Sequence, residues 1–159
     1  NNRNAYKGWK ASTKMKKRVG DPWIPASEYG RTLQGFGVNL LVKEIAVSVE
    51  FAKSVLQAEV LYADPDFAVL RREDMEWMLH ADHTYDKHPL INCLSSDGFR
   101  GSGIELRIHG LDPDEAERCA RTRGDRILAG AIDKKHGLRE VYILDPDGYL
   151  WVPDVPTRD

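Results

Sequence analysis

Residues 137–153 read GLREVYILDPDGYLWVP, and this stretch predicts a β-hairpin. Two runs rich in β-branched and aromatic residues lie on either side of Asp145-Pro146-Asp147-Gly148. In that junction Pro146 fixes φ, Gly148 accepts a positive φ, and the aspartate side chains can accept hydrogen bonds from nearby backbone amides. A hairpin alone does not define a fold, so the remainder of the chain must supply related elements.

The chain contains two similar series of predicted elements. The first runs strand, helix and three strands, at 38–42, from Ala46 onward, and at 59–62, 67–70 and 75–80. The second has the same order, at 103–108, from Pro113 to the residue before Gly124, and at 126–128, 140–144 and 149–152. Two βαβββ units about 65 residues apart form an internal repeat. The sequence therefore predicts an α+β protein built from two modules.

Two segments of this repeat resemble the glyoxalase/bleomycin-resistance/extradiol-dioxygenase superfamily, whose fold is called the vicinal oxygen chelate fold. They are residues 42–60, with Ser48 and Phe51 in the predicted helix, and residues 137–152. The resemblance implies one domain over 37–155, with modules at about 37–82 and 103–155, in which curved, mixed half-barrel sheets surround a concave cavity. Residues 1–36 precede it as an N-terminal basic extension and connector.

The metal enzymes of this superfamily take ligands from the first and fourth strands of each module. By the resemblance, those positions fall on Gly37, Met78, Val152 and either Gly103 or Glu105. Glycine, methionine and valine do not replace the imidazoles and carboxylates that bind divalent metals at such sites. We therefore expect no metal site of the usual kind and no cofactor.

Strand alternation predicts which side chains face the helices and which face the cavity. The apolar residues at 38, 40, 42, 104, 106 and 108 are expected to face the helices, and their neighbours to face the cavity together with Glu76 and Met78. These inward positions give six candidate ligand-binding residues: His80, Glu105, Arg107, His109, Glu140 and Tyr142. His80, Glu105 and Glu140 could instead form a displaced metal site or an acid/base set. Glu105 and Arg107 could equally be a simple ion pair.

Strand alternation and the helical period also predict which residues form the hydrophobic core. Trp77 and Trp151 fall on the apolar alternation of their strands and are expected to be buried. In the first helix the period places Val47 with Phe51 on the buried face, and Ser48 lies near the helix start, where its hydroxyl can satisfy a free amide.

Composition restricts the class of protein. The net charge of -2 gives no general attraction to polyanions, and no apolar run approaches the ~20 residues that span a bilayer. Two isolated cysteines and the lack of a signal-peptide pattern favour a cytoplasmic protein with reduced thiols. The basic residues between Arg3 and Arg18 are expected to form a solvated extension, so we expect no nucleic-acid partner. We expect a homodimer in which Trp9 and Trp23 contribute to the contact.

Two functional classes fit these observations. One is a metal-free protein that binds a small polar molecule, as the bleomycin-resistance branch of the superfamily does. The other is a lyase, isomerase or dioxygenase with an altered metal site. The positions lacking metal ligands favour the first class. The polar segment 82–103 joins the modules and is expected to cover the cavity as a lid.

Overall fold

The computed structural model describes residues 16–85, 87–94 and 99–158. The first module contains β1 (Val38–Val42), α2 (Ile45–Ser54), β2 (Glu59–Ala63), β3 (Phe67–Arg72) and β4 (Met75–Ala81). The second contains β5 (Glu105–His109), α3 (Pro113–Arg123), β6 (Arg126–Asp133), β7 (Leu138–Leu144) and β8 (Leu150–Pro156). Helix α1 (Ala26–Thr32) precedes the first module, and the 3-10 helices η1 (Asp82–Thr84) and η2 (Ile91–Cys93) lie between the modules. The predicted βαβββ repeat is confirmed.

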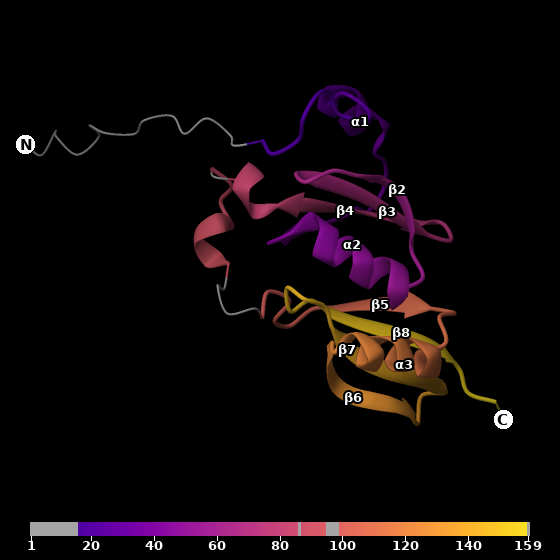
Figure 1. Cartoon of the computed structure of the whole chain (residues 1–159). Coiled ribbons are helices and arrows are strands. Elements are labelled where there is room, and N and C mark those ends of the chain that lie inside the picture. The colour runs from indigo at the N-terminus through magenta and orange to yellow at the C-terminus, as the bar shows by residue number, and fades with distance from the viewer. Residues whose placement is uncertain (1–15, 86, 95–98, 159) are drawn as a thin grey trace, which may run out of the picture.

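Each module forms one four-stranded mixed sheet (Figure 1). The strand orders are β1-β4-β3-β2 and β5-β8-β7-β6, so the two sheets have the same topology. In both, the first strand pairs parallel to the fourth, and the other neighbours are antiparallel. The α+β class and the mixed sheets are therefore as predicted, and neither sheet closes into a barrel.

The hairpin of β7 and β8 forms as its sequence predicts. The Oδ1 atom of Asp145 accepts hydrogen bonds from the amides of Asp147 at 2.9 Å and Tyr149 at 3.0 Å. Gly148 takes a φ of 81°, a conformation that glycine adopts without steric cost. The Trp151 indole donates to Oδ2 of Asp145 at 3.0 Å, which fixes the start of β8 against the turn.

Helix α3 also has its predicted bounds. The side chain of Asp112 accepts from the amides of Asp114 and Glu115, and Pro113 occupies the first turn. At the other end Gly124 has a φ of 82° and terminates the helix in the left-handed conformation.

Helix α2 differs from the prediction in two details. Val47 is 48% exposed, because the buried face passes through residues such as Ile45 and Ala52 instead. Ser48 is buried, but its hydroxyl does not cap the helix; it donates to Oδ2 of Asp147 at 3.1 Å. The serine near the helix start therefore joins the two modules.

This contact is part of a larger junction between the modules. The turn before β8 lies against the end of β1 and the start of α2, where the Lys43 amide donates to Oδ1 of Asp147 at 2.9 Å. The Tyr149 hydroxyl donates to the Leu41 carbonyl at 2.8 Å. Because Ser48, Asp147 and Tyr149 are buried, their bonds replace ones that water would otherwise make. The hairpin thus holds the first module as well as completing the second.

One hydrophobic core runs through both modules. The indoles of Trp77 and Trp151 lie 5.5 Å apart between ring centroids, and both are buried as predicted. Leu106 and Ile108 face this core, as strand alternation predicts. Ile104 does not; it is 56% exposed because β5 begins only at Glu105.

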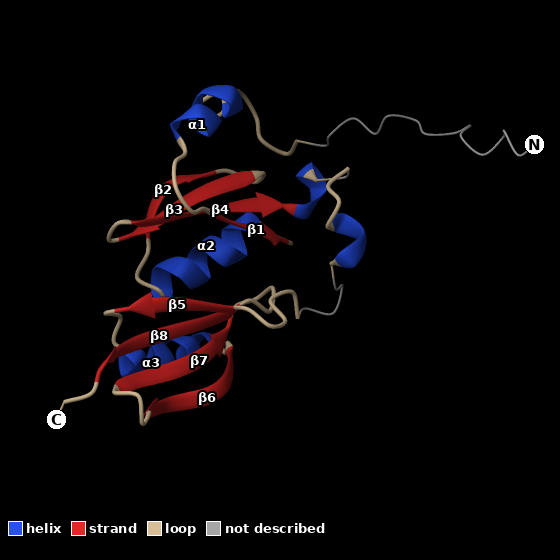
Figure 2. Cartoon of the chain, turned by 180° about the vertical axis from the view of Figure 1, so that it is seen from behind, coloured by secondary structure: helices blue, strands red, loops and turns tan. Residues whose placement is uncertain are grey.

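The segment before the first strand is more structured than the sequence indicates. Residues 1–36 were expected to be an extension and connector, but helix α1 forms within them, immediately after Pro25. In both views α1 lies on one side of the first sheet, and α2 lies on the opposite side, toward the second module (Figures 1 and 2). Trp23 packs on Tyr62 of its own chain, while Trp9 lies outside the described residues. The homodimer stays a prediction.

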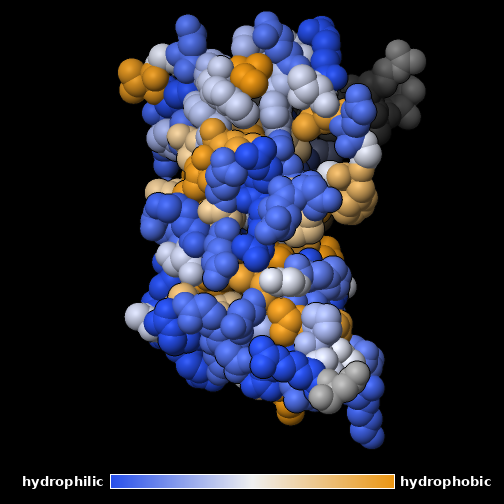
Figure 3. Space-filling view, turned by 90° about the vertical axis from the view of Figure 1, so that its right-hand side faces the viewer, coloured by the Kyte–Doolittle hydropathy of each residue, from blue (hydrophilic) through white to orange (hydrophobic). Residues whose placement is uncertain are grey.

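Within the described ranges, no helix is both long and apolar enough to cross a membrane. On the face drawn in Figure 3, hydrophilic residues cover most of the surface and hydrophobic ones appear between them in separate patches.

Candidate ligand-binding site

A pocket of about 470 Å³ lies between the N-terminal segment and the first sheet. Its walls come from three separate parts of the chain: residues 16–33, strands β2 to β4, and the start of the segment that joins the modules. The side chains that line it include Lys16, Trp23, Tyr29, Tyr62, Phe67, Met78, His80 and Tyr85. The volume falls within the range of small-molecule sites in proteins.

Four aromatic rings form one part of the wall. Trp23, Tyr29, Phe67 and Tyr62 contact one another in a closed cycle, with neighbouring ring centroids between 5.5 and 6.3 Å apart. These separations are those of favourable offset or edge-to-face aromatic pairs. Two of the rings come from the N-terminal segment and two from the ends of β2 and β3. The cycle therefore joins the segment to the sheet.

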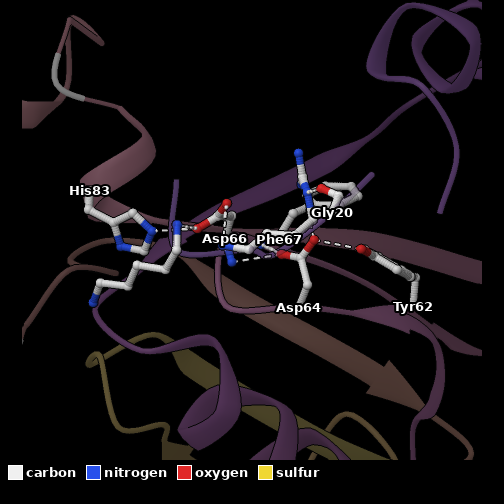
Figure 4. A network of polar contacts seen from close by, with 8 residues as sticks. Gly20, Tyr62, Asp64, Asp66, Phe67 and His83 are labelled. Atoms are coloured by element: carbon white, nitrogen blue, oxygen red, sulfur yellow. Dashed lines mark hydrogen bonds and ion pairs between the residues drawn. The ribbon is translucent and has the colours of Figure 1, made fainter. Parts of the chain in front are cut away.

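A set of polar contacts, the Asp64/Asp66 latch, fixes the N-terminal segment beside this wall (Figure 4). The carboxylate of Asp66 accepts from the amides of Lys17 at 2.8 Å and Arg18 at 3.3 Å, and lies 2.7 Å from Nε2 of His83. The carboxylate of Asp64 lies 3.1 Å from Nη1 of Arg18. The latch therefore holds the segment in two ways: Asp66 accepts from its backbone, and Asp64 pairs with the side chain of Arg18.

The two latch carboxylates also shape their own turn. Asp64 accepts from the amides of Asp66 at 2.7 Å and Phe67 at 2.8 Å, and from the Tyr62 hydroxyl at 2.6 Å. Burial alone would raise the pKa of Asp64, but these hydrogen bonds and the bond from Arg18 outweigh it and hold the pKa below its ordinary value. The pKa of Asp66 is lowered in the same way, by His83 and the two amides acting against burial. Both carboxylates are therefore ionised at neutral pH.

His80 lies on the pocket side of β4, as predicted. Its ring packs against Phe67 with centroids 4.7 Å apart and against Tyr85 at 4.8 Å, and Nδ1 lies 2.5 Å from Oδ1 of Asn39. Met78, two residues earlier on the same strand, also lines the pocket. Tyr85 follows η1, so the beginning of the predicted lid does contribute to the wall.

The other five predicted residues gather on the second sheet. The guanidinium of Arg107 pairs with Glu105 at 3.0 Å, with Glu140, and with Asp154 at 2.9 Å. Glu140 and Asp154 are each only 1% exposed. Burial would raise the pKa of Glu140, but Arg107 and the Tyr142 hydroxyl outweigh it and lower that pKa. We call this group, with Tyr142 and His109, the Arg107 cluster.

Each charged group of the Arg107 cluster has a partner within the cluster. His109 Nδ1 lies 2.7 Å from Asp154, and the Tyr142 hydroxyl donates to Glu140 at 2.8 Å. Burial and the neighbouring Glu140 raise the pKa of Tyr142, so its hydroxyl stays protonated. Five of the six predicted residues therefore share one face, while His80 alone lies in the pocket on the first sheet.

The aromatic wall was not predicted. Trp23 and Tyr29 belong to the connector, for which alternation within a strand says nothing. Tyr62 lies one residue before the end of β2 and Phe67 begins β3, on either side of the Asp64-Pro65-Asp66 turn. A signal was present in the sequence: two aromatic residues flanking a tight turn occupy neighbouring strand ends.

Neither the protein-family models nor the curated proteins match this sequence. Solved structures do match the chain. A glyoxalase-related enzyme from Fulvimarina pelagi aligns with a TM-score of 0.61 at 16% identity, over 77% of this chain and 88% of its own. A glyoxalase/bleomycin resistance protein/dioxygenase family enzyme from Burkholderia phytofirmans aligns with a TM-score of 0.63 at 15% identity, over 76% of this chain and 96% of its own. The chain has the vicinal oxygen chelate fold. A third match to this fold is the genomically encoded fosfomycin resistance protein FosX from Listeria monocytogenes, with a TM-score of 0.58 at 15% identity, over 79% and 95%.

Two of the positions at which the vicinal oxygen chelate fold implies metal ligands hold Met78, which lines the pocket, and Val152, which is fully buried. Among residues 16–85, 87–94 and 99–158, no three histidine, cysteine, aspartate or glutamate side chains group together to hold a metal ion. The alternative set of His80, Glu105 and Glu140 is divided between the two sheets and does not form such a site.

Proposed function

We propose that this chain is a small-molecule-binding protein whose site is the pocket between residues 16–33 and the first sheet. The observation that carries the proposal is the pocket itself, about 470 Å³ in volume, with walls from segments far apart in the sequence. Sites for small molecules are usually concave, largely preformed and lined mainly by apolar side chains, with a few polar groups. His80 and Lys16 are such polar groups here.

The fold supports the same class of function. The solved structures that it matches include proteins named for glyoxalase, bleomycin resistance, dioxygenase and fosfomycin resistance activities, all of which concern small molecules. One fold hosts many chemistries, so the proposal rests on the pocket and takes only the ligand's size class from the fold.

Binding in this pocket is proposed to need no metal ion. The pocket side of β4 presents Met78 and His80, and a single imidazole does not make a divalent metal site. The Arg107 cluster remains a predicted second set of ligand contacts. Its side chains are already bonded to one another, so His80 is the predicted residue on which the proposal depends.

The test uses a variant that fills the pocket. Gly30 lines the pocket from α1, and a Cβ added there would meet no atom within 4 Å, so Gly30→Leu adds volume without strain in the helix. Ser27→Leu adds the same side chain to the same exposed helix at a position that does not line the pocket. A fragment library is screened by ligand-observed NMR against both variants and the unaltered protein, with and without a chelator.

Fragments are expected to bind the unaltered protein and Ser27→Leu alike, and to bind Gly30→Leu at least about fivefold more weakly, because an overfilled site is costly. The chelator should change none of these affinities. Equal binding to all three proteins, or no fragment binding to any of them, would contradict the proposal.

A further inference from the structure

Building on the proposed function, we propose that the pocket selects a planar aromatic ring that carries an anionic group, as in an aryl carboxylate. Two independent features of the pocket point to this class. One is the orientation of the tyrosines in the aromatic wall. The other is a lysine at the pocket that has no carboxylate partner among the residues that the structure describes.

The tyrosine hydroxyls in the wall are already engaged with carboxylates. The hydroxyl of Tyr62 donates to Asp64 at 2.6 Å, and that of Tyr29 donates to Glu76 at 3.4 Å. Burial is the main cause that raises the pKa of both tyrosines, and their carboxylate partners raise it further, so both hydroxyls stay protonated and donating. These residues therefore contribute their rings to the pocket, and their polar ends are used elsewhere.

The rings accept a flat partner better than a saturated one. Trp23, Tyr62, Phe67 and Tyr29 form the closed cycle described above, and Phe67 continues to His80. A planar ligand ring can add another offset or edge-to-face contact of the same kind, which a saturated ring cannot make. The wall thus favours an aromatic ligand over a saturated one of equal size.

Charge then decides between an anion and a cation. Both oxygens of Asp66 are bonded to the segment or to His83, and Arg18 is paired with Asp64. Lys16 also lines the pocket and has no carboxylate partner among the residues that the structure describes. An anionic group of a ligand therefore finds a cation available at Lys16, whereas both oxygens of Asp66 are already engaged in hydrogen bonds. A ligand cation would gain from the rings but would meet the charge of Lys16 and no available carboxylate.

Lys16 is exposed, so its attraction for an anion is partly screened by water and salt. The preference for an acid over an amine should accordingly be moderate at low salt and smaller at high salt. This salt dependence distinguishes the charge effect from the ring effect, which salt leaves unchanged.

Three matched probes separate the two features: phenylacetate, cyclohexylacetate and phenethylamine. The first differs from the second in its ring and from the third in its charge. Binding is measured by isothermal titration on the full chain, on Phe67→Leu and on Lys16→Gln. Lys135→Gln, in the turn between β6 and β7, is the control for a lost surface charge.

Phenylacetate is expected to bind about fivefold more tightly than either other probe. Phe67→Leu should remove most of its advantage over cyclohexylacetate, and Lys16→Gln most of its advantage over phenethylamine, while Lys135→Gln changes neither. Tighter binding of the amine, or equal binding of the saturated acid, overturns the inference.

The failure of this inference is distinct from failure of the proposed function. If none of the three probes binds but other fragments bind and lose affinity in Gly30→Leu, the ligand class is wrong and the site stands. If no small molecule distinguishes Gly30→Leu from Ser27→Leu, both are wrong.

Discussion

Trp23 stacks on Tyr62, with ring centroids 5.5 Å apart and ring planes inclined by 16°. The indole belongs to the N-terminal segment and the phenol to β2, so this pair joins two parts of the chain separated by a strand and a helix. Together with the Asp64/Asp66 latch it holds the segment over the first sheet. The pocket therefore depends on a segment outside the βαβββ repeat.

Removal of the Asp66 carboxylate should loosen that segment. Asp66→Ala leaves the amides of Lys17 and Arg18 without their acceptor, a loss of about 1–3 kcal/mol for this local structure. Hydrogen exchange at these two amides should accelerate by at least about tenfold, measured by NMR. Asp74→Ala, in the turn between β3 and β4, should leave their exchange unchanged. Unaltered exchange in Asp66→Ala would mean that the latch does not hold the segment.

The same latch should release at acid pH. The pKa values of Asp64 and Asp66 lie below the ordinary 3.8 in the folded protein, so their charged forms stabilise the folded state. That stabilisation is complete above about pH 4 and is lost as pH falls through the lowered values. The hydrogen bonds of the Lys17 and Arg18 amides, followed by the temperature coefficients of their proton shifts, should persist from pH 7 to about 4 and be lost only below it. A transition centred above pH 4 would contradict the lowered pKa values.

The junction between the modules should depend strongly on Asp147. Asp147→Ala leaves the Lys43 amide and the buried Ser48 hydroxyl without their acceptor, so unfolding by urea should show a loss of roughly 2–3 kcal/mol. Ser48→Ala removes one donor only and should lose roughly 1 kcal/mol. If the two variants were equally stable, the second bond to Asp147 would have no role in the junction.

Arg107 should be the residue on which the second sheet's polar face depends. Arg107→Met leaves Glu140 and Asp154 buried without their cation, which should destabilise the protein by roughly 3 kcal/mol in urea unfolding. Glu105→Gln alters a partner that is half exposed and should change stability little. A neutral effect of Arg107→Met would show that water, and not Arg107, stabilises these carboxylates.

Local sequence signals predicted the elements because each signal is a property of neighbouring residues. Pro113 and Gly124 set the bounds of α3, and Asp145 and Gly148 set the turn of the hairpin. Strand alternation placed His80 on the pocket side of β4 for the same reason. Val47 was misplaced because the helical period does not reveal which neighbours the helix packs against.

The pocket could not be predicted in the same way, because it is made by contacts between distant residues. Nothing near Asp66 in the sequence indicates that its carboxylate receives the amides of Lys17 and Arg18. The prediction also took one cavity to be shared by both sheets. Instead, Arg107 and its carboxylates pair with each other on the second sheet, and the N-terminal segment forms the pocket with the first.

The central claim, that small molecules bind between the N-terminal segment and the first sheet, can be tested with methionine methyl groups. Met78 lines the pocket, whereas Met75 begins the same strand, is 39% exposed and does not line it. With ¹³C-labelled methionine methyls, the fragments that bind in the ligand-observed screen should shift the Met78 signal and leave the Met75 signal in place. Fragments that bind without moving Met78, or that move both signals equally, would contradict the account.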